Sequence, residues 1–246
     1  EDPPAVAARV SPRLLMLVHD SIMSFELGLG LRPEGKNGPR VRSLESYRAY
    51  FVKWADTWEY QALLRARVIS GSEELANQFN LLIDSYRYPK TLTTNQLTDI
   101  RRIKARVEAE RLPQGADPAR HLKLGKGSIS DVEWLVQLFQ LRNANQLSGL
   151  RVLGTLAALD ELESAGSVSR QDAQALRAAW LLASRCRSAL VLAVDKLVDI
   201  LPADRKQLEA MARILEYAPG SASRLEEDYL STTRKARAVY EKLFAQ

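Results

Sequence analysis

The chain has 246 residues, of which 46% are hydrophobic and 26% are charged. This length allows one large domain or two small ones, and the hydrophobic content indicates a folded protein with a buried core rather than a disordered chain. The single cysteine, Cys186, excludes an internal disulfide. No apolar run approaches the roughly 20 residues of a membrane span, and no segment has the form of a signal peptide. We therefore expect a cytoplasmic protein that does not associate with a membrane.

The positive net charge does not indicate a nucleic-acid-binding protein. The formal charge is +5 and the isoelectric point is about 9.3, but basic and acidic residues alternate along most of the chain, as in Arg106, Glu108, Glu110 and Arg111. No basic stripe alternates with stacking aromatic residues. The charges are those of a solvated surface, and we expect no nucleic-acid partner.

The first forty residues have a different pattern from the rest. Two short apolar runs, 14–18 and 25–31, are separated by turn-prone residues, and a turn rich in Pro and Gly follows at 32–39. Short apolar runs that end at Pro and Gly are typical of strands. This pattern predicts a small N-terminal β segment.

From Ser43 onward the apolar residues recur at steps of three and four, which predicts amphipathic helices. Ser43 is placed to accept hydrogen bonds as the N-cap of a helix with an aromatic face, and Ser130 is placed to cap a later one. Cys186 falls on the buried stripe of the longest helix, whose Ala-rich opposite side predicts burial on two sides. The expected helices cover 44–58, 72–86, 95–111, 130–143, 150–164, 170–200, 204–217 and the segment after Gly220. The expected fold is mainly α, an antiparallel helical bundle-like body with an N-terminal β remnant.

Five segments, in order along the chain, resemble one enzyme family. Residues 25–39 contain Leu-Arg-Pro-Glu-Gly, 41–47 read Val-Arg-Ser-Leu-Glu-Ser-Tyr, and 58–67 begin Trp-Glu-Tyr-Gln-Ala-Leu. Residues 100–104 and 122–134 continue the pattern. Over residues 25–246 the chain is similar to the C-terminal, adenylylating half of bacterial glutamine-synthetase adenylyltransferases of the actinobacterial type.

The resemblance implies an enzyme that transfers AMP from ATP to a tyrosine of glutamine synthetase and so regulates nitrogen assimilation. It implies ATP and Mg²⁺ for the intact enzyme, and glutamine synthetase and the PII signal protein as partners. It also implies two domains, a partial nucleotidyltransferase domain at residues 1–42 and an all-helical domain at 43–246. An alternative is a non-catalytic helical module that docks glutamine synthetase or PII protein.

The carboxylates that the family uses for catalysis are missing from the matching positions. Nucleotidyl transfer on this fold needs three carboxylates that hold two divalent ions, and the corresponding positions carry Pro12, Leu14 and Gly28. His19 and His121 have no partner at ligand spacing. We therefore expect no metal site and no cofactor bound to this chain, which alone would be inactive. The family's Gly-rich loop before the carboxylate pair and its helix between the two strands also have no counterpart here. This indicates either a sequence in which disordered or deleted stretches are closed up, or a degenerate domain.

Two segments are candidates for contacts with a nucleotide. Arg32 and Lys36 follow a predicted strand in a turn where fixed positive charge could meet a phosphate, although an exposed turn is the alternative. Lys123-Leu124-Gly125-Lys126-Gly127 precedes a helix, where Gly lets the backbone approach a phosphate and the helix presents free amides. An ordinary loop is the alternative there.

The two acidic residues that follow this loop admit two interpretations. Asp131 and Glu133 fall in the first turn of the predicted helix, where they would stabilise the positive end of the helix dipole. Binding of a metal ion is the alternative.

Overall fold

A computed structural model describes residues 3–19, 28–196 and 198–245, and this part of the chain is mainly helical. It divides into two compact units, residues 1–89 and 90–246, called here the first and second units. The division expected after residue 42 lies inside the first unit and stays a prediction, because it follows the domain pattern of a family rather than compactness. None of the described helices is long and apolar enough to cross a membrane.

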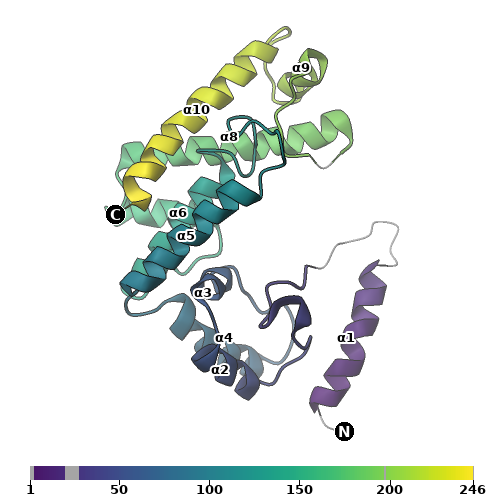
Figure 1. The fold of residues 1–246 in the computed structure, drawn as a ribbon, viewed down its shortest axis with the longest axis vertical. Coiled ribbons are helices and arrows are strands. Elements are labelled where there is room, and N and C mark those ends of the chain that lie inside the picture. Colours follow the sequence, from purple (N-terminus) through teal and green to yellow (C-terminus); the bar gives the residue numbers. More distant parts are fainter. Residues whose placement is uncertain (1–2, 20–27, 197, 246) are drawn as a thin grey trace. The chain divides into compact units, whose positions relative to one another are not determined.

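The first unit contains four α-helices and one short 3₁₀ helix within its described residues (Figure 1). Their bounds are α1 Pro3–His19, η1 Gly35–Asn37, α2 Leu44–Lys53, α3 Thr57–Leu63 and α4 Glu73–Arg87.

The second unit contains six α-helices and one 3₁₀ helix within its described residues. Their bounds are α5 Thr94–Glu110, α6 Ile129–Asn143, η2 Ser148–Leu150, α7 Thr155–Ser164, α8 Arg170–Val194, α9 Arg205–Ile214 and α10 Ala222–Phe244.

The strand expected over residues 14–18 of the N-terminal β remnant was wrong. The run 14–18, expected as a strand, lies within α1. Its residues are mostly Leu and Met, and Ala-rich residues precede it, so strong helix formers outweigh the shortness of the run. The second expected strand, 25–31, falls partly on residues 20–27, which lie outside the described residues, and 28–31 form no strand.

The first unit has an aromatic core. Tyr50, Phe51 and Ile83 are buried at its centre, and the Phe51 ring stacks on Tyr86 with 4.9 Å between centroids. The Ser43 cap is confirmed, because its side chain accepts from the Ser46 amide.

The helix expected over 44–58 is in fact two helices, α2 and α3, so the described part of residues 43–246 has nine α-helices where eight were expected. The break follows from Asp56, which caps α3 through a capping box with Glu59. Trp54 lies at the break, and 66% of it is exposed. It is not part of the aromatic face.

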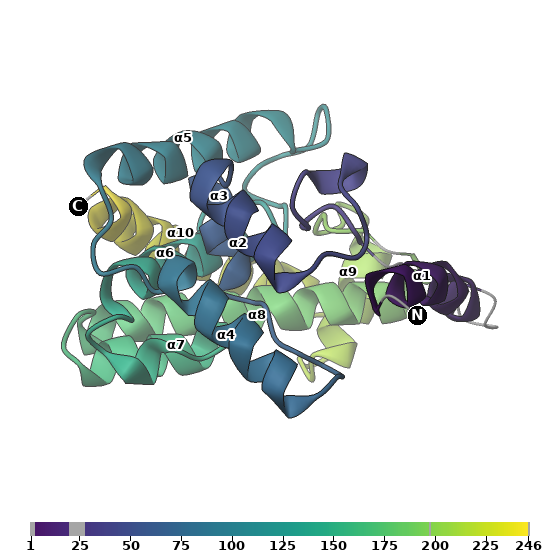
Figure 2. The ribbon, with the colours of Figure 1, turned by 90° about the horizontal axis from the view of Figure 1, so that it is seen from below.

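The second unit is built around α8. Helices α6, α7, α9 and α10 pack against it (Figures 1 and 2), which agrees with the expectation that it is buried on more than one side. Cys186 is fully buried in the core of this unit, as predicted, and burial raises the pKa of its thiol to about 12. The thiol is therefore an apolar packing group at neutral pH.

Helix α8 is shorter than expected and ends at Val194 rather than near residue 200. Asp195 adopts a left-handed conformation with φ of 51°, which ends the helix. The chain beyond it pairs with an earlier segment, because the Leu122 amide donates to the Asp199 carbonyl at 2.7 Å and the Leu201 amide to the Arg120 carbonyl at 2.8 Å. These bonds fix the start of the loop that carries the glycines.

Candidate functional site

The Leu-Arg-Pro-Glu-Gly turn is held together by its own arginine. The Arg32 guanidinium donates to the carbonyl oxygens of Leu29 at 2.6 Å, Lys36 at 2.9 Å and Gly38 at 2.9 and 3.0 Å. Gly38 is required by close packing, because a Cβ there would lie 2.0 Å from the Pro33 carbonyl oxygen. Arg32 therefore has a structural role in this turn, whereas the Lys36 side chain is exposed.

The same turn is tied to the helices of the first unit through Tyr50. The Tyr50 hydroxyl accepts from the Glu34 amide at 3.3 Å and donates to the Glu59 carboxylate at 2.9 Å. Arg42 pairs with the Glu34 carboxylate at 2.8 Å and lies over the Tyr50 ring. Burial raises the pKa of Glu59 above its ordinary value. The Trp-Glu motif thus supplies a buried acceptor that positions the turn.

The glycine loop of the second unit uses its backbone amides internally. The amides of Lys123 and Leu124 donate to His121 Nδ1 at 3.3 and 3.0 Å, and that of Gly125 donates to the His121 carbonyl at 2.9 Å. Burial lowers the pKa of His121, which keeps the ring neutral and Nδ1 free to accept. His121 is therefore a satisfied core residue.

Both glycines of this loop are explained by packing. A Cβ on Gly125 would lie 2.2 Å from the His121 carbonyl oxygen, and one on Gly127 would lie 1.8 Å from the carbonyl oxygen of Thr233 in α10. Gly127 also has φ of +73°, which side chains disfavour. The glycines let the loop touch α10, while Lys123 and Lys126 are exposed to solvent.

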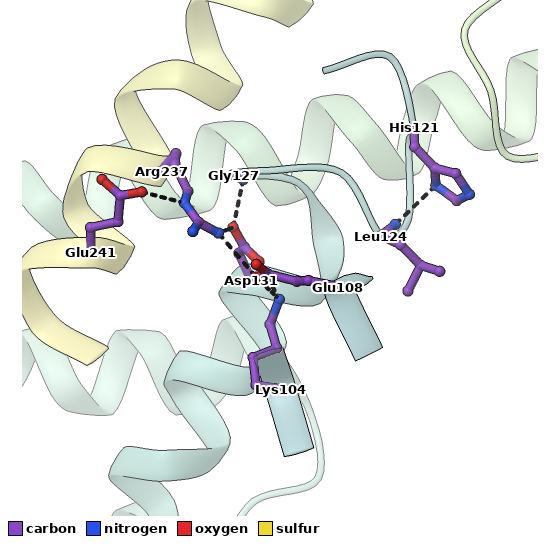
Figure 3. A network of polar contacts seen from close by, with 8 residues as sticks. All are labelled: Lys104, Glu108, His121, Leu124, Gly127, Asp131, Arg237 and Glu241. Atoms are coloured by element: carbon purple, nitrogen blue, oxygen red, sulfur yellow. Dashed lines mark hydrogen bonds and ion pairs between the residues drawn. The ribbon is translucent and has the colours of Figure 1, made fainter. Parts of the chain in front are cut away.

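A buried ion-pair network lies directly behind the loop (Figure 3). Asp131, only 1% exposed, accepts from Lys104 of α5 at 2.6 Å, from Arg237 of α10 at 2.9 Å and from the Gly127 amide at 2.6 Å. Lys104 and Arg237 also contact Glu108 at 2.6 and 3.0 Å. The network joins the loop to α5, α6 and α10.

The network shifts the pKa values of Glu108 and Arg237 toward their charged forms. Burial alone would raise the pKa of Glu108, but the hydrogen bonds from Lys104 and Arg237 outweigh it and hold that pKa below the ordinary value. Burial would likewise lower the pKa of Arg237, but the carboxylates of Glu241 and Asp131 raise it. Because the buried Lys104 and the partly buried Arg237 face two carboxylates, the charges are matched.

Of the two acidic residues expected in the first turn of the helix after the loop, the structure places only Asp131 there, and the placement of Glu133 in that turn was wrong. Helix α6 begins after Ser128, which is its N-cap, so the prediction of Ser130 as the cap was wrong by two residues. Asp131 lies in the first turn as expected, but its main contacts are the ion pairs and the Gly127 amide. Sequence reasoning missed Lys104, although a lysine on the apolar stripe with Ile100 and Val107 signals a buried carboxylate partner.

The positions expected for catalytic carboxylates show no acidic cluster. Pro12 and Leu14 lie in α1, and Gly28 lies in an irregular segment. Among the residues that the structure describes, no three or more His, Cys, Asp or Glu side chains group closely enough to hold a metal ion.

Comparison with known proteins identifies the family. Residues 100–244 match the family model described as GlnD PII-uridylyltransferase, and residues 5–81 match the model described as glutamate-ammonia ligase adenylyltransferase. The chain belongs to this family of adenylyl- and uridylyltransferases. The first of these matches covers more than half of the chain and includes the glycine loop and the whole ion network.

Curated relatives of this family carry one name. A bifunctional glutamine synthetase adenylyltransferase/adenylyl-removing enzyme of Leifsonia xyli is 55% identical over 97% of this chain, and namesakes of Streptomyces avermitilis and Mycobacterium marinum are 49% and 47% identical over 87% and 89% of it. The chain spans 24%, 22% and 22% of these relatives, respectively. It therefore corresponds to about a quarter of their length.

The network makes Asp131 the most sensitive polar residue of the second unit. We expect Asp131→Asn to lower the free energy of unfolding by about 3 to 5 kcal/mol, because it removes the more deeply buried of the two carboxylates that the buried Lys104 and the partly buried Arg237 share. Urea denaturation followed by circular dichroism measures this. Glu241→Gln is the matched control, since its carboxylate is 62% exposed and its loss should change stability by less than about 1 kcal/mol. Equal effects of the two substitutions would contradict the assignment.

The lowered pKa of Glu108 predicts an acid-sensitive contribution to stability. Its folded-state pKa lies below the ordinary value of 4.5, so the unfolded state binds more protons in this window and stability rises with pH across it. The contribution is fully present above about pH 4.5 and is lost as pH falls through the folded-state pKa. We expect Glu108→Gln to be less stable than the parent at neutral pH, with the difference vanishing in acid. A difference that stays constant down to acid unfolding would exclude this role.

Proposed function

We propose that the chain is a segment of an ATP-dependent enzyme that transfers AMP to a tyrosine of glutamine synthetase in the cytoplasm. The observation that carries the proposal is the 55% identity over 97% of this chain to an enzyme with that target in its name. The activity, substrate and partners belong to the whole relative, and the chain covers 24% of it. ATP and Mg²⁺ are the expected substrate and metal of the intact enzyme.

The residues present do not fit a pair of magnesium ions. Pro12, Leu14 and Gly28 bear no carboxylate, and one or two scattered acids cannot bridge a triphosphate through two metals. We propose that this chain by itself does not catalyse AMP transfer and that its role is to bind and position.

The six nucleotide-binding candidates divide into two groups. Arg32, Gly125 and Gly127 are engaged in the packing of their own segments, as described above, so we assign them structural roles. The second group consists of side chains that are exposed to solvent, namely Lys36, Lys123 and Lys126. These three lysines are the side chains that we propose for contacts with nucleotide phosphates in the intact enzyme.

A helical docking module is the second candidate function. Residues 5–81 match a model named for the enzyme that acts on glutamate-ammonia ligase, whereas 100–244 match one named for a PII uridylyltransferase. A region shared by enzymes with different targets cannot by itself select one target. This division favours glutamine synthetase contacts in the first unit, and it leaves a PII contact of the second unit as the alternative to be tested.

Incubation with glutamine synthetase, ATP and Mg²⁺ tests the proposed loss of catalysis. We expect no covalent AMP on glutamine synthetase above background by intact-mass spectrometry, because the metal ligands are missing. We also expect sedimentation of the same mixture to show a complex of the two proteins. A second mixture with PII protein tests the other partner. Transfer of AMP would contradict the claim of an incomplete site, and absence of a complex in both mixtures would contradict the docking function.

The lysine assignment predicts a selective loss of nucleotide affinity. We expect the double variant Lys123→Ala/Lys126→Ala to bind ATP several-fold more weakly at low salt, since each exposed ion pair contributes up to about 1 kcal/mol. Titration with a fluorescent ATP analogue measures this affinity. Lys206→Ala, an exposed lysine of α9, is the control. If all three proteins bind ATP equally, the glycine loop makes no phosphate contact in this chain.

A further inference from the structure

The first unit has an apolar groove between the N-terminal turns of α2 and α4. The hollow has a volume of about 560 Å³, which is within the range of binding sites. The side chains of Leu44 and Tyr47 line it from α2, and those of Leu75 and Phe79 line it from α4. The loop that contains Val68 closes one side.

This groove borders the aromatic core of the first unit. Tyr47 and Phe79 form an edge-to-face pair with 5.6 Å between ring centroids, and both pack on the buried residues of the first unit. At the rim, Leu75 is 53% and Val68 is 37% exposed. Exposed apolar surface that continues a core is stabilised when another apolar surface covers it.

Helix α1 already contributes to the groove. Its Ala7 is one of the lining residues, and Val10, Leu14 and Leu17 follow at steps of three, four and three, so they share one face with Ala7. Val10 is 54%, Leu14 58% and Leu17 74% exposed. The face that begins in the groove is therefore apolar and largely uncovered.

Helix α1 also needs support from another surface. Pro12 lies inside it, where a proline ring is unfavourable and its missing N–H removes a hydrogen bond. Isolated helices of this length are marginal even without such a residue. Contact with another apolar surface would therefore stabilise α1 as a helix.

The charges of the two partners are complementary. Helix α1 carries Arg9 and Arg13 and no acidic residue between Pro3 and His19. The first turns of α2 and α4 carry Glu45 and the pair Glu73 and Glu74. Among the described residues that line the groove, the one cation is Arg42, which pairs with Glu34.

We propose that the groove between α2 and α4 is the docking site of α1 and that α1 is a strap that closes over it. Ala7 is the contact point, because its small side chain lets the helix approach the groove. Closure buries Val10 and Leu14 against the aromatic edge of the core. Release of the strap exposes a groove suited to a basic, apolar helix.

A substitution in α1 itself, followed by hydrogen exchange of the full chain, tests whether α1 docks in the groove. We expect Ala7→Glu to raise exchange at least about tenfold in α1 and in the groove segments 44–47 and 68–79, because a charge cannot enter the apolar groove. Helix α8 of the second unit should keep its protection. Ala8→Glu, at an exposed neighbouring position, is the matched control and should exchange like the parent. Identical exchange in both variants would overturn the proposal.

A variant on the groove side tests the same contact without altering α1. Leu75→Glu lies at the exposed rim and should also raise exchange in α1, whereas Leu81→Glu, at a position 75% exposed on the same helix, should not. Sedimentation of the parent chain completes the test. A monomer whose α1 stays protected on dilution supports docking within one chain, and protection of α1 that is lost on dilution would overturn it.

Discussion

The buried carboxylate of Asp131 determines how the second unit is assembled. It lies at the start of α6 and accepts from Lys104 of α5, from Arg237 of α10 and from the Gly127 amide. A buried charge is tolerated only when its partners are in place. Because these partners come from three other segments of the chain, the carboxylate fixes the positions of α5, α10 and the glycine loop relative to α6.

This constraint changes the meaning of the glycine motif. A Gly-x-Gly sequence before a helix resembles a phosphate cradle, in which free amides would face a ligand. Here the Gly127 amide faces Asp131, and the glycine itself provides the space in which the loop meets the backbone of α10. The loop packs against α10 and α6 through its glycines, while the side chains of Lys123 and Lys126 are exposed to solvent.

In the first unit, too, the motif residues form contacts within the protein rather than facing a ligand. Arg32 binds carbonyl oxygens of its own turn, and Glu59 holds Tyr50, which in turn holds the Glu34 amide. The motif residues that carry the family resemblance are thus largely engaged in positioning. The exposed lysines beside them remain available for contacts with other molecules.

The sequence predicted those parts of the fold that depend on local signals. Helices α4 and α5 begin and end within one residue of the expected bounds, because Ser72 and Thr93 accept from backbone amides at their first turns and Pro89 and Pro113 follow their ends. The apolar position of Cys186 was likewise evident from periodicity alone.

Local signals failed where distant segments decide the structure. The bond between Lys104 and Asp131 spans 27 residues and that between Asp131 and Arg237 spans 106, so no periodicity within one helix reveals them. The run 14–18 was ambiguous because a short apolar run suits a strand or a helix equally. Helix α8 ends at the left-handed Asp195, and the segment beyond it pairs with residues 120–122, which is again a distant contact.

A double-mutant cycle on Lys104 and Asp131 tests the central claim most directly. Unfolding free energies of the parent, Lys104→Met, Asp131→Asn and the double variant give the coupling energy between the two side chains. If the pair organises the second unit, the double variant will lose less unfolding free energy than the two single variants lose together. The difference, which is the coupling energy, will exceed about 1.5 kcal/mol. Single effects that add to within about 0.5 kcal/mol would show that the two groups are independent and would contradict the account.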